Sequence, residues 1–188
     1  IMDFVGPAML DGQFDFPLYD VTRAVFADEK AGFVDLEGAL AASERIYGNQ
    51  SLMSPLIGNH DKSRFMAYAD GDLPDREEPD EEEVGWVRPP RVNNPTSFDK
   101  LKSAFAFLLA IDGVPMIYYG DEFGLSGAGD PDNRREMRFG EELAPKEREA
   151  RERFAALAKI RAAHPALRFG SRRALGQVLS FDQARLGA

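Results

Sequence analysis

The chain reads Ser54-Pro-Leu-Ile-Gly-Asn-His-Asp-Lys-Ser-Arg64 at its most informative point. The apolar run Leu56-Ile57 lies between a proline and a glycine, which is typical of a strand end buried on both faces, as in a parallel sheet. Three polar residues, Asn59-His60-Asp61, follow directly. Parallel α/β folds bind their ligands at the carboxyl ends of the strands. The stretch therefore predicts a functional loop, in which a carboxylate beside an imidazole suits stabilising positive charge while hydrogen-bonding hydroxyls.

One alternative for this stretch is a metal site. Gly-Asn-His-Asp at 58–61 resembles a ligand loop of the metallophosphoesterases, in which Asn and His bind a dinuclear metal centre. Such a centre needs several more histidine ligands, and the chain contains only His60 and His164. The histidine count argues strongly against this alternative, so we expect no metal site in the chain.

Strand-like and helical patterns alternate outward from this stretch. Polar and aromatic residues alternate from Gln13 to Leu18, which predicts a strand that ends at Pro17, with Phe14 and Phe16 in the core. A helical segment is expected next, over 21–26. The other expected elements are helices at 35–47, 97–111 and 145–163, a buried strand at 114–119, and β-like pieces at 166–169 and 177–181.

Capping and breaking residues support the helices. Asp35 can cap the first long helix and Gly48 can end it. Thr96-Ser-Phe-Asp99 has the form of a capping box, and Pro145 suits the first turn of the last long helix. His164 then reads as a helix-end residue before a proline. The order of strand, loop and helix indicates an α/β fold with a parallel sheet, with about three strand–helix units where a closed barrel needs eight.

Charge and composition exclude several classes of partner. The net charge is −9, and residues 70–83 hold nine acidic residues and one basic residue. The rest of the chain is therefore close to neutral, and no basic face for nucleic acid is expected. We expect the acidic run to be a solvated loop, since it lacks the spacing of a calcium loop. No membrane-spanning run, signal-peptide pattern or cysteine occurs, and the cytoplasm is slightly favoured as the compartment.

Trp86 follows the acidic run in Gly85-Trp-Val-Arg-Pro-Pro90. A tryptophan can stack on a sugar, because one face of a pyranose is apolar. The alternative, which we favour, is that Trp86 packs the loop against the body of the protein.

A second motif identifies a family. Gly113-Val-Pro-Met-Ile-Tyr-Tyr-Gly-Asp-Glu122 is followed by Asp130-Pro-Asp-Asn-Arg134. This pattern resembles the final barrel strand and loop of the α-amylase superfamily (glycoside hydrolase family 13), and Asn59-His60-Asp61 resembles its fourth conserved region. The stretch 13–19 is similar to its sixth-strand region. The resemblance implies a partial (β/α)8 TIM barrel, about strands six to eight with their helices, running into the start of a C-terminal β-sandwich. The implied domains are 1–165 and 166–188.

The resemblance also implies roles for individual residues. Asp61 would stabilise the transition state, and His60 would hydrogen-bond the same sugar. Asn59 belongs to the predicted substrate-binding residues, with holding the loop as its favoured role, and Arg64 would be either a sugar contact or an ion-pair partner. Asp130 and Arg134 resemble a pair that grips the next sugar. Adjacent Asp121 and Glu122 point apart at a strand end and resemble a structural pair.

The implied function is that of a fragment of a retaining enzyme that acts on α-glucans, either a glycoside hydrolase or a transglycosidase. In the family, the Asp nucleophile and the Glu acid/base lie on strands four and five, which would precede Ile1. The alternative is a carbohydrate-binding or structural protein of the same fold. The expected partner is an α-glucan oligosaccharide, and no cofactor is expected, with any calcium site belonging to the full-length parent. We also expect the open barrel edges to be covered, either by the missing half or by another copy.

Overall fold

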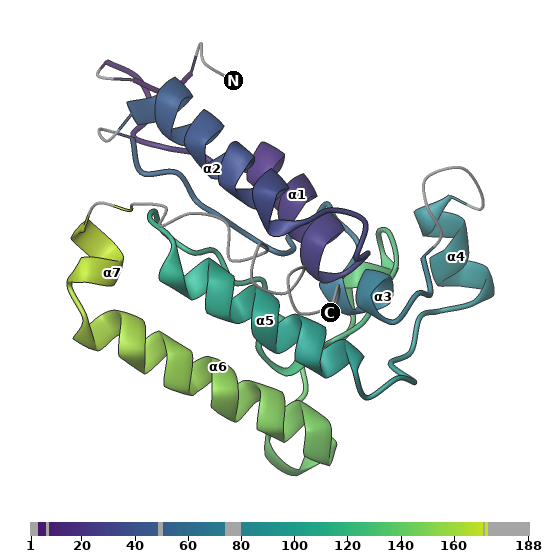
Figure 1. Cartoon of the computed structure of the whole chain (residues 1–188). Helices are drawn as coiled ribbons and strands as arrows, with labels where there is room; N and C mark the ends of the chain where they lie inside the picture. Colours follow the sequence, from purple (N-terminus) through teal and green to yellow (C-terminus); the bar gives the residue numbers. More distant parts are fainter. Residues whose placement is uncertain (1–3, 7, 49–50, 74–79, 171, 173–188) are drawn as a thin grey trace, which may run out of the picture.

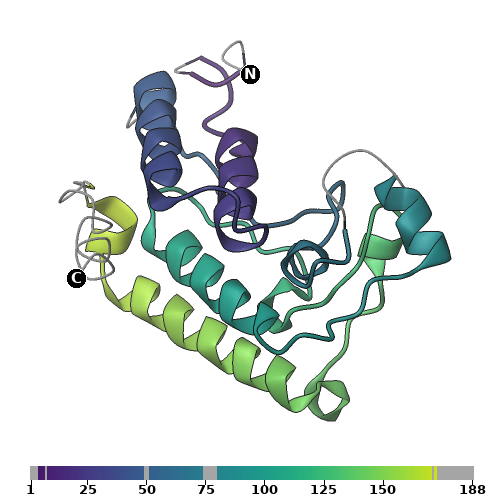
Figure 2. The ribbon, with the colours of Figure 1, turned by 45° about the vertical axis from the view of Figure 1, so that its right-hand side comes forward.

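The computed structural model describes residues 4–6, 8–48, 51–73, 80–170 and 172. Helices α1 and α2 form an antiparallel pair, and α5 and α6 lie side by side and run in the same direction (Figures 1 and 2). The α-helices are α1 Phe16–Phe26, α2 Phe33–Tyr47, α3 Phe65–Ala69, α4 Glu81–Val87, α5 Ser97–Ala110, α6 Pro145–Ala163 and α7 Ala166–Phe169, with short 3-10 turns η2 Asp121–Phe123, η3 Asp132–Arg134 and η4 Gly140–Glu142.

Three extended segments pair in parallel in the order that the sequence predicts, but the strand expected to be buried at 114–119 is not regular, and its first residue, Val114, is 54% exposed. The segment at 52–57 is central: the Leu52 and Ser54 amides donate to carbonyls at 11 and 13 over 2.7 and 2.8 Å. On its other side the Val114 and Met116 amides donate to carbonyls at 53 and 55, both over 2.9 Å. Each pairing amounts to one isolated parallel bridge, so none of the described residues belongs to a regular strand. The prolines at 55 and 115 lack the N–H that would extend the pairing.

The first of these segments is shorter than predicted. The strand expected to reach Pro17 stops by Asp15, and α1 begins at Phe16. Asp15 is the reason, because its Oδ1 accepts a hydrogen bond from the Leu18 amide over 3.1 Å and caps the helix. Pro17 then lies in the first turn, where a missing N–H costs nothing. The alternation of aromatic residues therefore covers two elements: an extended segment that ends by Asp15 and a helix that begins at Phe16.

The predicted long helices form close to their expected limits, with differences at their starts. Helices α3 and α4 were not predicted, and α4 includes Glu81–Glu83 of the acidic run that was expected to be a loop. The helix at 145–163 has the expected limits, and His164 is its C-cap. α2 begins two residues before Asp35, which accepts from the Gly32 amide over 2.8 Å instead of acting as N-cap. The Thr96 hydroxyl donates to Asn94 Oδ1 and makes no bond to the helix it precedes.

The β-like segment predicted at 166–169 is wrong, because these residues form α7. The piece at 177–181 lies outside the described residues.

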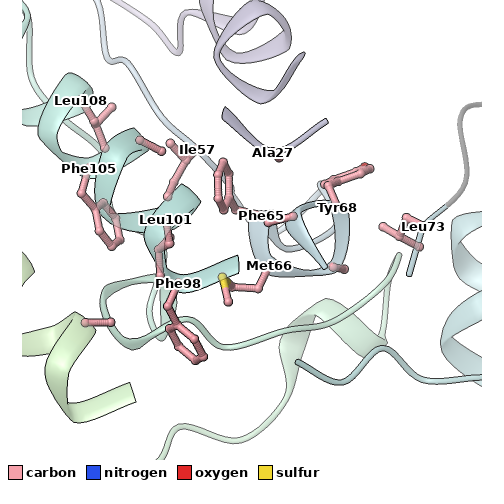
Figure 3. Packing of buried hydrophobic residues seen from close by; sticks show 14 of the residues in the cluster. Ala27, Ile57, Phe65, Met66, Tyr68, Leu73, Phe98, Leu101, Phe105 and Leu108 are labelled. Carbon is pink, nitrogen blue, oxygen red and sulfur yellow. The ribbon is translucent and has the colours of Figure 1, made fainter. Parts of the chain in front are cut away.

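The main core lies between one face of the paired segments and helices α3, α5 and α6 (Figure 3). Ile57 from the central segment contributes to this core together with Phe65, Leu101 and Phe105. Side chains alternate between the two faces of extended chain, so Leu52 points to the opposite face and is 61% exposed. One face of the paired segments is therefore only partly covered.

Arg161 fastens the end of α5 to the third extended segment. From α6 its guanidinium donates to the carbonyls of Leu109 and Ile111 over 3.0 and 2.7 Å, and to that of Gly113 over 2.7 Å. These carbonyls belong to the last turn of the helix and the residues after it, which lack intrahelical partners. Burial lowers the pKa of Arg161. None of the helices in the described part of the chain is long and apolar enough to cross a membrane.

Candidate functional site

His60 and Asp61 lie together at the carboxyl end of the central segment. His60 Nε2 is 3.3 Å from Asp61 Oδ1, and the two side chains are 55% and 66% exposed. Asn59 is buried, and its Oδ1 accepts from the Asp61 amide over 2.9 Å, which forms an Asx-turn. The turn holds the backbone of Asp61 while its carboxylate faces solvent, where it can reach a ligand.

Asn133 holds the same loop from the other side. Its side chain is completely buried, and its Nδ2 donates to the carbonyls of His60 and Lys62 over 2.9 and 3.1 Å. Sequence reasoning did not single out this residue, although it lies in the motif at 130–134. Asn133 joins the loop after the third extended segment to the loop after the central one.

Arg64 is an ion-pair partner, and its assignment as a substrate-binding residue needs correction. The side chain is completely buried, so no surface is left for a sugar. Its NH1 lies 3.0 Å from Asp121 Oδ1 and donates to the Tyr119 carbonyl over 2.6 Å. Its Nε donates to the Asn133 carbonyl over 2.8 Å, and the guanidinium lies 4.0 Å from the centre of the Tyr118 ring.

Asp121 and Glu122 are structural, as the sequence suggests. Burial raises the pKa of Asp121 to about 6, against the attraction of Arg64. The Asp121 carboxylate fits against Gly58, where an added Cβ would lie 3.2 Å from Oδ2. Glu122 instead accepts from the Gly120 amide over 2.8 Å. Asp121 thus pairs with Arg64, whereas Glu122 binds a backbone amide, so the two carboxylates do not act together.

Asp130 and Arg134 form a forked ion pair on the loop around η3. Arg134 Nε is 2.8 Å from Asp130 Oδ1, and its NH2 is 3.2 Å from Oδ2. Their side chains are 50% and 43% exposed, so both remain accessible to a ligand. Asn133 lies between them in sequence and links this loop to His60. The structure therefore brings both predicted pairs onto two connected loops.

Aromatic residues and a lysine border the His60–Asp61 loop. Lys62 Nζ lies 5.7 Å from the centre of the Phe16 ring and 5.8 Å from that of the Tyr19 ring. Phe16 belongs to α1, so Lys62 connects the loop to the first helix by cation–π contacts.

A cavity lies elsewhere in the described part of the chain. It has a volume of about 460 Å³ and is lined by residues of α2, by the start of the central segment and by α7, and it includes none of the predicted site residues. In the described part of the chain, no three His, Asp or Glu side chains gather closely enough to hold a metal ion. The predicted pairs His60–Asp61 and Asp130–Arg134 thus lie on exposed loops, away from this cavity.

Comparisons with known proteins bear on these loops, although no family model matches the chain. A cyclomaltodextrin glucanotransferase of Bacillus licheniformis is 32% identical over 157 residues, which cover 84% of this chain and 18% of the relative. A solved α-amylase of Anoxybacillus superposes with a TM-score of 0.64 at 27% identity, over 84% of this chain and 29% of that one. An α-amylase of Geobacillus thermoleovorans, solved with acarbose, gives 0.62 at 26% identity over the same shares. The chain thus spans about a fifth of the first relative.

Proposed function

Because this chain belongs to the α-amylase family, glycoside hydrolase family 13, we propose that it is one part of a retaining enzyme acting on α-glucans. That enzyme is a glycoside hydrolase or a transglycosidase. The observation that carries the proposal is Asp61, an exposed carboxylate held by an Asx-turn at the end of the central parallel segment. Names of relatives support the substrate class, since they include glucanotransferases and amylases.

The chain corresponds to strands six to eight of a (β/α)8 barrel with their helices. Three parallel segments in the order 11–15, 52–57 and 114–116, each followed by helices, support this assignment. The C-terminal β domain proposed for 166–188 would begin with a helical turn, because residues 166–169 form α7. The uncovered face around Leu52 suits the interior of a barrel completed by the remaining strands.

Asp61 would act electrostatically. Retaining glycosidases pass through a transition state with oxocarbenium character at the sugar carbon. A fixed carboxylate beside that carbon stabilises the positive charge, and preorganisation by Asn59 and Asn133 means that little reorganisation accompanies the reaction. His60, at 3.3 Å from Asp61, can hydrogen-bond a hydroxyl of the same sugar.

Asp130 and Arg134 would bind the next sugar. Both side chains are partly exposed to solvent. The two contacts between the carboxylate and the guanidinium hold them together, so they can hydrogen-bond a sugar as one unit. The link through Asn133 fixes their position relative to His60. The site would thus accept successive sugars of an oligosaccharide along the two connected loops.

The nucleophile and the acid/base would come from strands four and five, outside the printed sequence. Asp121, the carboxylate nearest to Arg64, is committed to a buried ion pair and cannot replace them. We therefore expect the 188-residue chain alone to lack glycosidase activity. Hydrolysis of a nitrophenyl α-maltoside by the purified chain, above that of its Asp61→Ala variant, would contradict this expectation.

The main experiment replaces Asp61 with Asn in the full-length protein. The substitution keeps the shape and removes the charge, so we expect kcat to fall by at least ~10², the scale for losing one preorganised electrostatic group. Asp99→Asn serves as a control, because Asp99 lies on the exposed side of α5. Circular dichroism should show that both variants are folded. If Asp61→Asn retains more than half its turnover, the assignment fails, and a binding protein without chemistry becomes the better explanation.

A further inference from the structure

We propose that Trp86 on α4 is a second sugar-binding platform, which stacks on a glucose ring of an α-glucan chain beyond the Asp130–Arg134 pair. This inference rests on the proposed function, and it names a site on a different element. Trp86 is the only tryptophan in the chain. The expectation that it packs inward is wrong, because the side chain is 73% exposed.

α4 is held firmly even though it is short. The Glu81 carboxylate accepts from the Ser63 hydroxyl over 2.6 Å and from the Tyr68 hydroxyl over 2.7 Å. The Glu81 carbonyl accepts from the Gly129 amide over 3.0 Å. Val84, on the inner side of the helix, is 2% exposed and joins the main core. The exposed indole therefore stands on a rigid support, which lowers the entropy lost when a ligand binds.

The support is continuous with the candidate site. Ser63 follows Asp61 by two residues, and Gly129 immediately precedes Asp130. Gly85, next to Trp86, approaches the same loop so closely that an added Cβ would lie 2.8 Å from Asp132 Cβ. Helix α4 thus touches both loops that carry the predicted sugar-binding pairs.

A third contact joins the residues after α4 to the loop around η3. The Arg135 guanidinium forks onto Asp132 and donates to the Pro90 carbonyl over 2.8 Å. Consequently the segment that carries Trp86 is fixed on both sides to the loop that carries Asp130 and Arg134.

The surrounding charge favours a neutral ligand. Glu82 and Glu83 precede Trp86 on the exposed part of α4, and the run at 70–83 is strongly acidic. These carboxylates disfavour anionic polymers on the N-terminal side of Trp86, while exposed Arg88 follows it by two residues. A pyranose carries no charge, offers an apolar face to the indole, and keeps its hydroxyls in water. Aromatic rings supply such contact area with little loss of side-chain freedom.

The test measures chain-length dependence in the full-length protein. Dissociation constants for maltotriose and maltoheptaose are measured by calorimetry in an Asp61→Asn background, in which turnover is slowed. We expect Trp86→Ala to weaken maltoheptaose binding about tenfold, which corresponds to ~1.4 kcal/mol, and to leave maltotriose binding unchanged. Trp86→Phe should recover part of the loss, because a smaller aromatic ring still stacks. Val87→Ala is the matched control, since Val87 is the neighbouring residue and is 76% exposed.

Several outcomes would overturn the inference. They are an unchanged dissociation constant for maltoheptaose in Trp86→Ala, an equal loss for both sugars, and a loss of the same size in Val87→Ala. A change in the sedimentation of Trp86→Ala without a change in sugar binding would assign the indole to a protein contact instead. Failure of the proposed function is separate, because it appears as retained turnover in Asp61→Asn whatever Trp86 does.

Discussion

The buried Arg64–Asp121 pair offers the sharpest test of how the loops are held. Replacing Arg64 with Met keeps an unbranched chain of similar reach and removes the guanidinium. Asp121 then loses its partner at 3.0 Å, and the carbonyls of Tyr119 and Asn133 lose their donors. All of these contacts lie in an environment where Arg64 itself has no exposed surface, so water cannot replace the lost donors without rearrangement.

The expected cost follows from the burial. Removing one partner of a buried ion pair destabilises a protein by about 3–5 kcal/mol, because the other charge remains uncompensated. Arg45 on α2 provides a matched control, since it is exposed and Arg45→Met makes the same chemical change. Surface substitutions of this kind usually alter stability by less than about 0.5 kcal/mol.

The assay is urea unfolding of the full-length protein, followed by circular dichroism at neutral pH. With a slope of about 2 kcal/mol per molar urea, a loss of 3–5 kcal/mol lowers the midpoint by about 1.5–2.5 M. The Arg45→Met midpoint should stay near that of the wild type. A loss of less than about 1 kcal/mol in Arg64→Met would refute the reasoning, since it would mean that Arg64 contributes little net stability.

Two other variants test the same loops. Burial raises the pKa of Asp121 to about 6 in the folded protein, above its unfolded value, so the wild type should lose stability relative to Asp121→Asn as pH rises from 4 to 7. Urea midpoints of both proteins at several pH values measure this, and a constant or opposite difference would contradict it. Asp130→Ala combined with Arg134→Ala should weaken the use of long maltooligosaccharides more than that of short ones, because the pair would bind the next sugar. Kinetics on a ladder of chain lengths checks this, and equal losses at all lengths would assign the pair to the fold.

Local patterns in the sequence predicted the long helices and the order of the parallel segments, but not the short helices α3, α4 and α7. The helix at 145–163 was found with both limits, because Pro145 starts it and His164-Pro165 ends it. The start and end of a helix can be predicted from sequence, because helical hydrogen bonds join residues four apart and capping residues act within one turn. The candidate pairs came from the resemblance to motifs of the family, and each motif is a short stretch: His60 adjoins Asp61, and Asp130 and Arg134 are four residues apart.

Contacts between distant segments could not be read in this way. The sequence left Arg64 between a sugar contact and an ion pair, and the choice depends on Asp121, which lies 57 residues away. Asn133 holds the carbonyl of His60 across 73 residues, and no local pattern indicates which loop it meets. The exposure of Trp86 likewise follows from the face of α4 that turns toward the loop at 129–132. Short-range hydrogen bonding and periodicity are encoded residue by residue, whereas burial and pairing at these loops arise only when the three parallel segments bring their ends together.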